Sequence, residues 1–155
     1  MSGTRLLLVG AALVVAFAGC GGDGEKQVTK AQYEQKLEQI GHDLYKAANA
    51  LGASSNTSIF IDNLDKLEQV LKKSADELHG VKPPLDARPA NDRLVDAYRK
   101  LAGQVDKVKD ARRESYARAL AALKAVQRST AAQETREAAR ELRKLSYIVP
   151  VSTTL

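Results

Sequence analysis

Cysteine is almost absent from this 155-residue sequence, since Cys20 is the only one. One thiol cannot close a disulfide within the chain, so the fold must depend on packing alone. Tryptophan is missing and phenylalanine occurs only twice, whereas Ala, Leu, Lys, Glu and Arg are abundant. Because these are strong helix formers, the composition favours a single all-α domain.

Residue types that catalyse reactions or bind metals are also scarce. The only histidines are His42 and His79, and the only methionine is Met1. In an antiparallel helix pair that turns near residue 54, the two histidines would lie about 18 Å apart, too far to share a zinc or a haem. Neither a glycine-rich phosphate loop nor a nucleophile elbow occurs. We therefore expect no enzyme activity, no catalytic residue, no metal and no cofactor.

The N-terminal segment has the pattern of a secretory signal. Arg5 precedes the run LLLVGAALVVAFA, which is shorter than the ~20 apolar residues that span a bilayer. The residues FAGC, which overlap the end of this run, resemble the lipobox of bacterial lipoproteins. We expect a signal peptide over 1–19, a diacylglyceryl group on the sulfur of Cys20, and a flexible tether over 20–28. The alternative is ordinary cleavage after AFA, which would leave Cys20 as a free thiol in an oxidising compartment.

Apolar residues then recur at intervals of three and four over three successive segments, which is the period of a coiled-coil or bundle seam. A capping box of Thr29 and Gln32 begins the first helix, and Gly52 with the polar run SSNTS ends it. A Pro-Pro pair forbids continuation of the second helix, and Asp86 is placed to cap the third. The predicted inward positions are Tyr33, Leu37, Ile40, Leu44, Ala47, Leu51, Phe60, Leu64, Leu67, Leu71, Ser74, Leu78, Leu94, Tyr98, Leu101, Val105 and Val108.

The last helical segment is harder to divide, because it contains neither Gly nor Pro before Pro150. We place a break at the sequence RRES, with Ser115 as a cap. The competing boundary lies near residue 129, where Thr130 and Gln133 resemble a capping box. The inward positions expected in a single fourth helix are Tyr116, Leu120, Leu123, Val126, Ala131, Ala138, Leu142 and Leu145.

Four helices of similar length predict an antiparallel, up-and-down four-helix bundle over residues 29–147. The predicted helices cover about 29–52, 58–80, 86–112 and 115–146, and a C-terminal tail covers 148–155.

A further pattern spans most of the chain after Cys20. A capped helix is followed by ELHGVKPPLDARPANDRLVDAYRKLA and by a long Ala-rich helix that ends in LRKLSYIVP. Together with the lipobox, this order resembles a group of small uncharacterised lipoproteins from actinobacteria. Members of that group often carry a cysteine in the first helix and another near the C-terminus, where this chain has Gly41 and the Val149–Pro150 region. The resemblance implies a four-helix bundle without that disulfide, and it implies no function.

Charge is unevenly distributed along the chain. Ten acidic residues accompany seven lysines between residues 21 and 80, whereas fifteen basic residues accompany eight acidic ones between 88 and 144. Cations on the third helix are a candidate surface for an anionic partner, and the alternative is an ordinary solvated, salt-bridged face. Nucleic acid is not expected, because the chain is predicted to be exported and few rings are available for stacking. The candidate surface consists of Arg99, Lys100, Lys107, Lys109, Arg112 and Arg113.

These features lead to one functional expectation and one rival. We expect a non-enzymatic protein, anchored by lipid to the outer face of the cytoplasmic membrane, that binds or spaces an envelope protein or an anionic wall polymer. The rival is a helical bundle that holds a small apolar molecule or a lipid, with room for it beside Ala131 and Ala138. A closed core favours the first function, and a cavity of about 300 Å³ or more favours the second.

Overall fold

The computed structural model describes residues 27–54 and 56–150. The predicted signal peptide, the lipidation site Cys20 and residues 151–155 lie outside the described residues. The described part is all-helical and has no strand, which confirms the all-α part of the prediction. None of its helices is long and apolar enough to cross a bilayer. Its elements are α1 (Lys30–Gly52), α2 (Thr57–His79), the 3₁₀ turn η1 (Leu85–Ala87), α3 (Arg88–Glu114), α4 (Tyr116–Gln127) and α5 (Thr130–Lys144).

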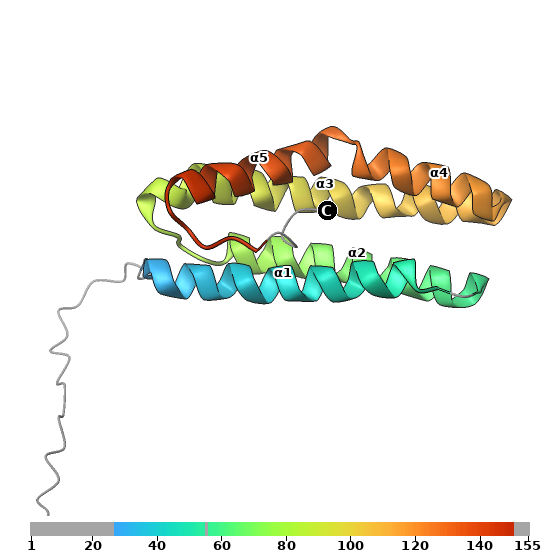
Figure 1. Cartoon of the computed structure of the whole chain (residues 1–155), viewed down its shortest axis with the longest axis horizontal. Coiled ribbons are helices and arrows are strands. Elements are labelled where there is room, and N and C mark those ends of the chain that lie inside the picture. Colours follow the sequence, from blue (N-terminus) through green and yellow to red (C-terminus); the bar gives the residue numbers. More distant parts are fainter. Residues whose placement is uncertain (1–26, 55, 151–155) are drawn as a thin grey trace, which may run out of the picture.

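The helices pack in two layers along a common long axis (Figure 1). One layer holds α1 and α2 side by side, and the other holds α3 with α4 and α5, which follow one another along it. The central element is α3, because α2, α4 and α5 all pack on it, whereas α1 packs mainly on α2. The turn from α3 to α4 lies at the opposite end of the molecule from the start of α1 (Figure 1).

Capping side chains define two of the predicted helix ends. The hydroxyl of Thr29 accepts a hydrogen bond from the amide of Gln32, and the Gln32 side chain accepts one from the amide of Thr29 at 2.9 Å, so the predicted capping box is confirmed. Ser115 ends α3 and begins α4, because its hydroxyl accepts a hydrogen bond from the amide of Arg118 at 3.2 Å. The predicted break at RRES is therefore confirmed.

The seam predicted for the first three helices forms the core. Every predicted inward position from Tyr33 to Val108 is buried, and Leu37, Leu64 and Leu101 have no exposed surface. Burial of one such side chain stabilises the fold by about 1.5–3 kcal/mol, so this seam favours the association of α1, α2 and α3. Its register is as predicted.

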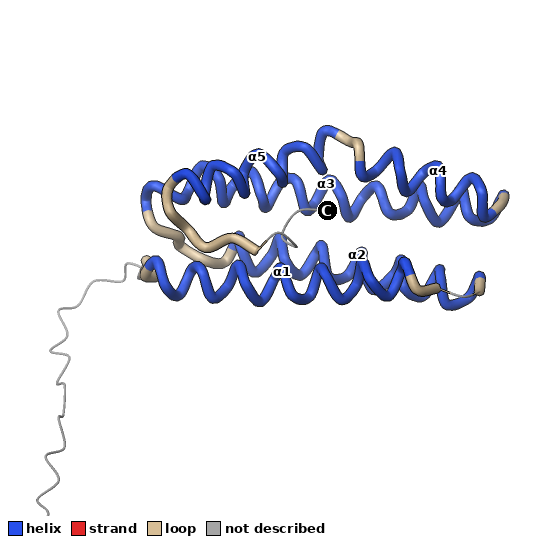
Figure 2. Tube along the Cα trace, in the orientation of Figure 1, coloured by secondary structure: helices blue, strands red, loops and turns tan. Residues whose placement is uncertain are grey.

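The predicted single helix over 115–146 is wrong, because the chain divides there into α4 and α5 (Figure 2). The hydroxyl of Ser129 accepts a hydrogen bond from the amide of Ala132 at 3.3 Å and so caps α5 one residue before the predicted box at Thr130. A serine that bonds to nearby backbone offers the chain an alternative to a continuous helix. Helices therefore end and begin at both boundaries considered from the sequence, the one at RRES and the one near residue 129. Three predicted inward positions of this segment are exposed, namely Tyr116, Leu120 and Leu145.

The residues after α5 fold back over the first layer. Ser146 has a φ of 65°, and the amide of Tyr147 donates to the carbonyl oxygen of Leu142 at 3.0 Å, which is the Schellman arrangement of a helix end. The ring of Tyr147 then meets that of Tyr33 edge-to-face at 5.8 Å. Its hydroxyl donates to Asp86 at 2.8 Å, so Asp86 serves as an acceptor in η1 rather than as the predicted cap of the third helix.

Candidate functional site

An apolar cavity of about 400 Å³ lies toward the end of the molecule where α1 ends and α4 begins. Side chains from α1, α2, α3 and α4 form its wall, and nearly all of them are aliphatic or aromatic. The cavity is lined by Ala48, Leu51, Gly52, Phe60, Leu64, Leu67, Leu71, Leu101, Val105, Tyr116, Leu120, Leu123, Val126 and Gln127.

The cavity is present because α4 covers the core less closely than α5 does. Six residues of α5 are buried, most of them alanines, whereas Ala119 is the only buried residue of α4. Small side chains let helices approach closely, and larger ones hold them apart. On α4 the larger side chain of Leu120 remains 37% exposed, and Leu123 and Val126 are only partly buried. Both α4 and α5 pack mainly on α3, but Tyr147, which follows α5, is buried against Tyr33 of α1, whereas the space beside α4 stays open.

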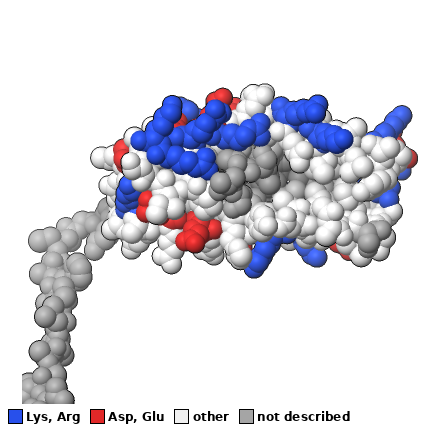
Figure 3. Space-filling model, viewed as in Figure 1, with Lys and Arg blue, Asp and Glu red and all other residues white. Residues whose placement is uncertain are grey.

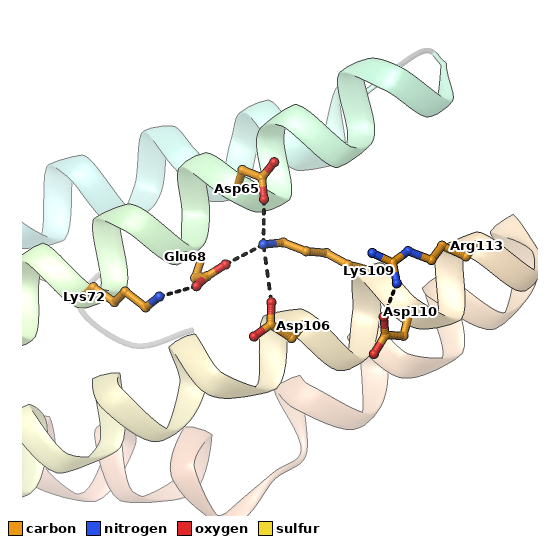
Figure 4. A network of polar contacts seen from close by, with 7 residues as sticks. All are labelled: Asp65, Glu68, Lys72, Asp106, Lys109, Asp110 and Arg113. Atoms are coloured by element: carbon orange, nitrogen blue, oxygen red, sulfur yellow. Dashed lines mark hydrogen bonds and ion pairs between the residues drawn. The ribbon is translucent and has the colours of Figure 1, made fainter.

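Two aromatic rings and an arginine lie at one end of the cavity. Phe60 and Tyr116 line its wall with their ring centroids 5.7 Å apart in edge-to-face geometry. The guanidinium carbon of Arg112 lies 5.5 Å from the centroid of the Tyr116 ring, and its Nη2 donates to the hydroxyl of Thr57. The Nε of Arg112 is buried without a hydrogen-bond partner in the described residues. The neighbouring Arg113 instead pairs with an aspartate of its own helix at 3.0 Å (Figure 4).

The cavity wall has few polar groups. The described residues that line it include no carboxylate, imidazole, thiol or amine, and their polar side-chain groups are the amide of Gln127 and the hydroxyl of Tyr116. No group of three or more His, Cys, Asp or Glu in the described part of the chain could hold a metal ion. His42 on α1 and His79 at the end of α2 are both exposed.

The basic residues predicted as one surface point to more than one side of α3. Arg99 approaches Asp76 of α2 at 3.7 Å, whereas Lys100 approaches Glu134 of α5 at 2.8 Å. Lys107 is exposed to solvent. Arg99 and Lys100 are therefore neighbours in sequence, but they form ion pairs with two different helices.

Lys109 belongs to a network of charges between α2 and α3 (Figure 4). Its ammonium group lies 2.6 Å from Asp65 and 2.5 Å from Glu68 on α2, and 3.5 Å from Asp106 on its own helix. The side chain of Lys109 is only 18% exposed. It therefore holds the two helices together instead of presenting its charge to an outside partner.

The same network alters two pKa values. Hydrogen bonds from Lys109 and from Lys72 lower the pKa of the Glu68 carboxyl. Burial lowers the pKa of Lys109, but its hydrogen bonds to Asp65 and Glu68 and their negative charges outweigh burial, and the net effect raises that pKa. Lys109 and Glu68 consequently keep their opposite charges at neutral pH.

A second group of cations, not singled out from the sequence, lies on α5. Figure 3 shows Lys and Arg side chains gathered over this helix. The sequence signal was the run REAARELRK, in which the spacing of the cations places them along one face. This α5 patch consists of Arg136, Arg140, Arg143 and Lys144.

Sequence reasoning also missed the position of the cavity. It expected room beside Ala131 and Ala138, but these alanines are 2% and 0% exposed and do not line the cavity. The signal that marks the site is the contrast between the larger apolar residues of α4, such as Leu123, and the alanines of α5. No protein family, curated protein or solved structure matches the chain. The functional conclusion therefore depends on the cavity and its surroundings.

Proposed function

We propose that this protein is a lipid-anchored extracytoplasmic lipoprotein whose helical domain binds a small apolar molecule without transforming it. The observation that supports binding is the cavity of about 400 Å³ with its aliphatic and aromatic wall. Small-molecule sites usually occupy about 300–1,000 Å³ and are mostly apolar with few polar groups. The cavity has the size and the chemistry of such a site.

Packing energetics favour an occupant. Protein interiors are normally packed as densely as organic crystals, and apolar side chains that face open space lose dispersion contacts. Leu120 lines this cavity and is 37% exposed, and Leu123 and Val126, which also line it, are only partly buried. An apolar ligand would restore those contacts and remove the remaining exposed surface from water.

The proposal includes the arrangement of the helices and the anchor. We infer an up-and-down four-helix bundle in which α4 and α5 together form the fourth member, and a diacylglyceryl group on Cys20. The tether would join the bundle at the start of α1, and the 23 residues of α1 extend about 35 Å. Because Leu51 and Gly52 line the cavity at the other end of α1, the ligand site would face away from the membrane.

Contact with an anionic wall polymer or an acidic envelope protein is a second candidate function. The α5 patch favours it, because its cations lie together on one helix face. The cations of α3 support it less, since Arg99, Lys100 and Lys109 pair with carboxylates of the same molecule. Ligand binding is therefore the better supported of the two functions.

The test uses an uncharged fluorescent probe, N-phenyl-1-naphthylamine, whose emission rises in an apolar site. We expect the purified protein to bind it, and Leu120→Glu to abolish binding, because a carboxylate would then stand in the cavity wall. Leu145→Glu is the matched control: Leu145 is 38% exposed and Leu120 is 37% exposed, but Leu145 does not line the cavity. Absence of binding by the unaltered protein, or equal loss in both variants, would contradict the proposed function.

A further inference from the structure

We propose that the ligand is a single-chain amphiphile with an anionic headgroup, whose hydrocarbon chain fills the cavity and whose headgroup is bound by Arg112. This inference rests on the proposed function and names the class of molecule that the cavity takes. It depends on three observations: the shape of the cavity, the positive charge at one end of it, and the pairing of the neighbouring arginines with carboxylates.

The shape fits one hydrocarbon chain. On α2 the lining residues extend from Phe60 to Leu71, and on α4 they extend from Tyr116 to Gln127. The two members of each pair are eleven positions apart on a helix, which corresponds to about 16 Å. The apolar wall is therefore elongated, and an extended hydrocarbon chain lying along it would contact α2 and α4 over that length.

The charge lies at the aromatic end of the cavity. Arg112 stacks on Tyr116, which lines the wall, and its Nε carries a hydrogen that no group in the described residues accepts. A guanidinium group presents its donors in a plane that matches a carboxylate or a phosphate. An acceptor that follows the chain out of the cavity at Tyr116 would supply the partner that Arg112 lacks.

The neighbouring cations are already occupied. Arg113 pairs with Asp110 at 3.0 Å, and Arg118 pairs with Glu114. No ion pair of Arg112 with a carboxylate occurs within residues 27–54 and 56–150; its polar partner there is the neutral hydroxyl of Thr57. Among these three arginines, Arg112 is therefore the one whose charge remains available to a ligand.

Two sources share this chemistry, namely a free fatty acid and a monoacyl phospholipid with an anionic headgroup. Both present one chain and one anion, and the structure selects for these two features together. Straight-chain alkanoates and monoacylglycerol phosphates are therefore tested separately. The series that binds more tightly shows whether the ligand is a fatty acid or a monoacyl phospholipid.

The experiment measures displacement of N-phenyl-1-naphthylamine from the purified full chain by each series and by the matching alkan-1-ols. Each added methylene contributes about 0.8 kcal/mol of burial, so affinity is expected to rise about fourfold per carbon until the cavity is full, and then to level off. An anionic headgroup is expected to bind at least tenfold more tightly than the alcohol of the same length.

The decisive comparison is Arg112→Gln with its neighbour Arg113→Gln. Arg112→Gln is expected to remove the preference for anion over alcohol while alcohol binding persists, which also shows that the variant is folded. Arg113→Gln is expected to keep the preference. If alcohols bind as tightly as anions, or if both variants behave alike, the headgroup assignment is overturned while the proposed function stands. If the probe binds but neither series displaces it, this inference fails while the proposed function stands. If the probe itself does not bind, the proposed function and this inference fail together.

Discussion

Lys109 illustrates that a cation in a basic stretch of sequence is not necessarily available to a partner. Its ammonium group contacts two carboxylates of α2, and its side chain is 18% exposed. Nothing in the local sequence indicates this, because Asp65 and Glu68 lie about forty positions earlier. The structure thus turns a member of the predicted surface into a cross-link between α2 and α3.

Substitution of Glu68 by glutamine should show how much this cross-link contributes to the free energy of unfolding, and how that contribution depends on pH. Hydrogen bonds from Lys109 and Lys72 lower the pKa of Glu68 in the folded state, so its stabilisation is present above its unfolded pKa of about 4.5 and is lost as the pH falls through the lower, folded value. We expect Glu68→Gln to destabilise the protein by about 1–2 kcal/mol at pH 7, and the difference to shrink below pH 4.5. Urea unfolding at several pH values measures it. A destabilisation that is equal at pH 3 and pH 7 would contradict the charge assignment.

The core leucines permit a second prediction at the residue scale. Leu37, Leu67 and Leu101 are at most 6% exposed, and each change to alanine should cost about 2–5 kcal/mol, because it removes buried surface and leaves a cavity. Glu38→Ala and Lys66→Ala, at exposed positions on the same helices, should cost well under 1 kcal/mol. Chemical denaturation of the five variants tests the register, and a cost under 1 kcal/mol at Leu67 would be inconsistent with it.

At the scale of elements, the first three helices could be predicted because their information is local. The period of three and four residues and the capping box at Thr29 depend only on near neighbours in sequence. The division of the fourth predicted helix into α4 and α5 was harder to predict from the sequence. Two serines offer caps, Ser115 and Ser129, and sequence alone does not show that both are used.

The cavity could not be placed from the sequence for a different reason. An apolar stripe on a helix predicts that it faces the core, but not how closely the helix approaches it. Tyr116 and Leu120 have the correct spacing, and yet they remain 48% and 37% exposed and line an open cavity. Distance between elements is a tertiary property, and it is this distance that creates the site.

The looser attachment of α4 predicts faster amide hydrogen exchange there than in α3. Local opening requires little buried apolar surface to be exposed, and Ala119 is the only buried residue of α4. We expect the amides of residues 120–127 to exchange at least tenfold faster than those of residues 98–108, and an alkanoate to slow exchange selectively in α4. Exchange followed by NMR or mass spectrometry measures both. Equal protection of α3 and α4 would show that α4 is as firmly packed as the rest.

The whole molecule has two ends with different roles in the proposal. The predicted tether leads to the start of α1, whereas the cavity and Arg112 lie at the end where α3 turns into α4. A headgroup held beside Arg112 would be about 35 Å from the tether, since that is the length of α1. This distance exceeds several Debye lengths at physiological salt, so charged headgroups of the bilayer would not compete electrostatically for Arg112.

The anchor itself is tested by removing its sulfur. Cys20→Ala should release the protein into the medium or leave an unprocessed precursor in the membrane, because the acceptor of the diacylglyceryl group is lost. The core and the cavity should remain intact, since the helices that form them begin at Lys30, after the predicted tether. Phe17→Leu is the control, because it changes a neighbouring apolar residue toward the usual lipobox and should leave anchoring unchanged. Cell fractionation and the mass of the mature protein provide the measurement. A mature chain that carries an unmodified Cys20 would refute the lipoprotein proposal and favour ordinary secretion after AFA.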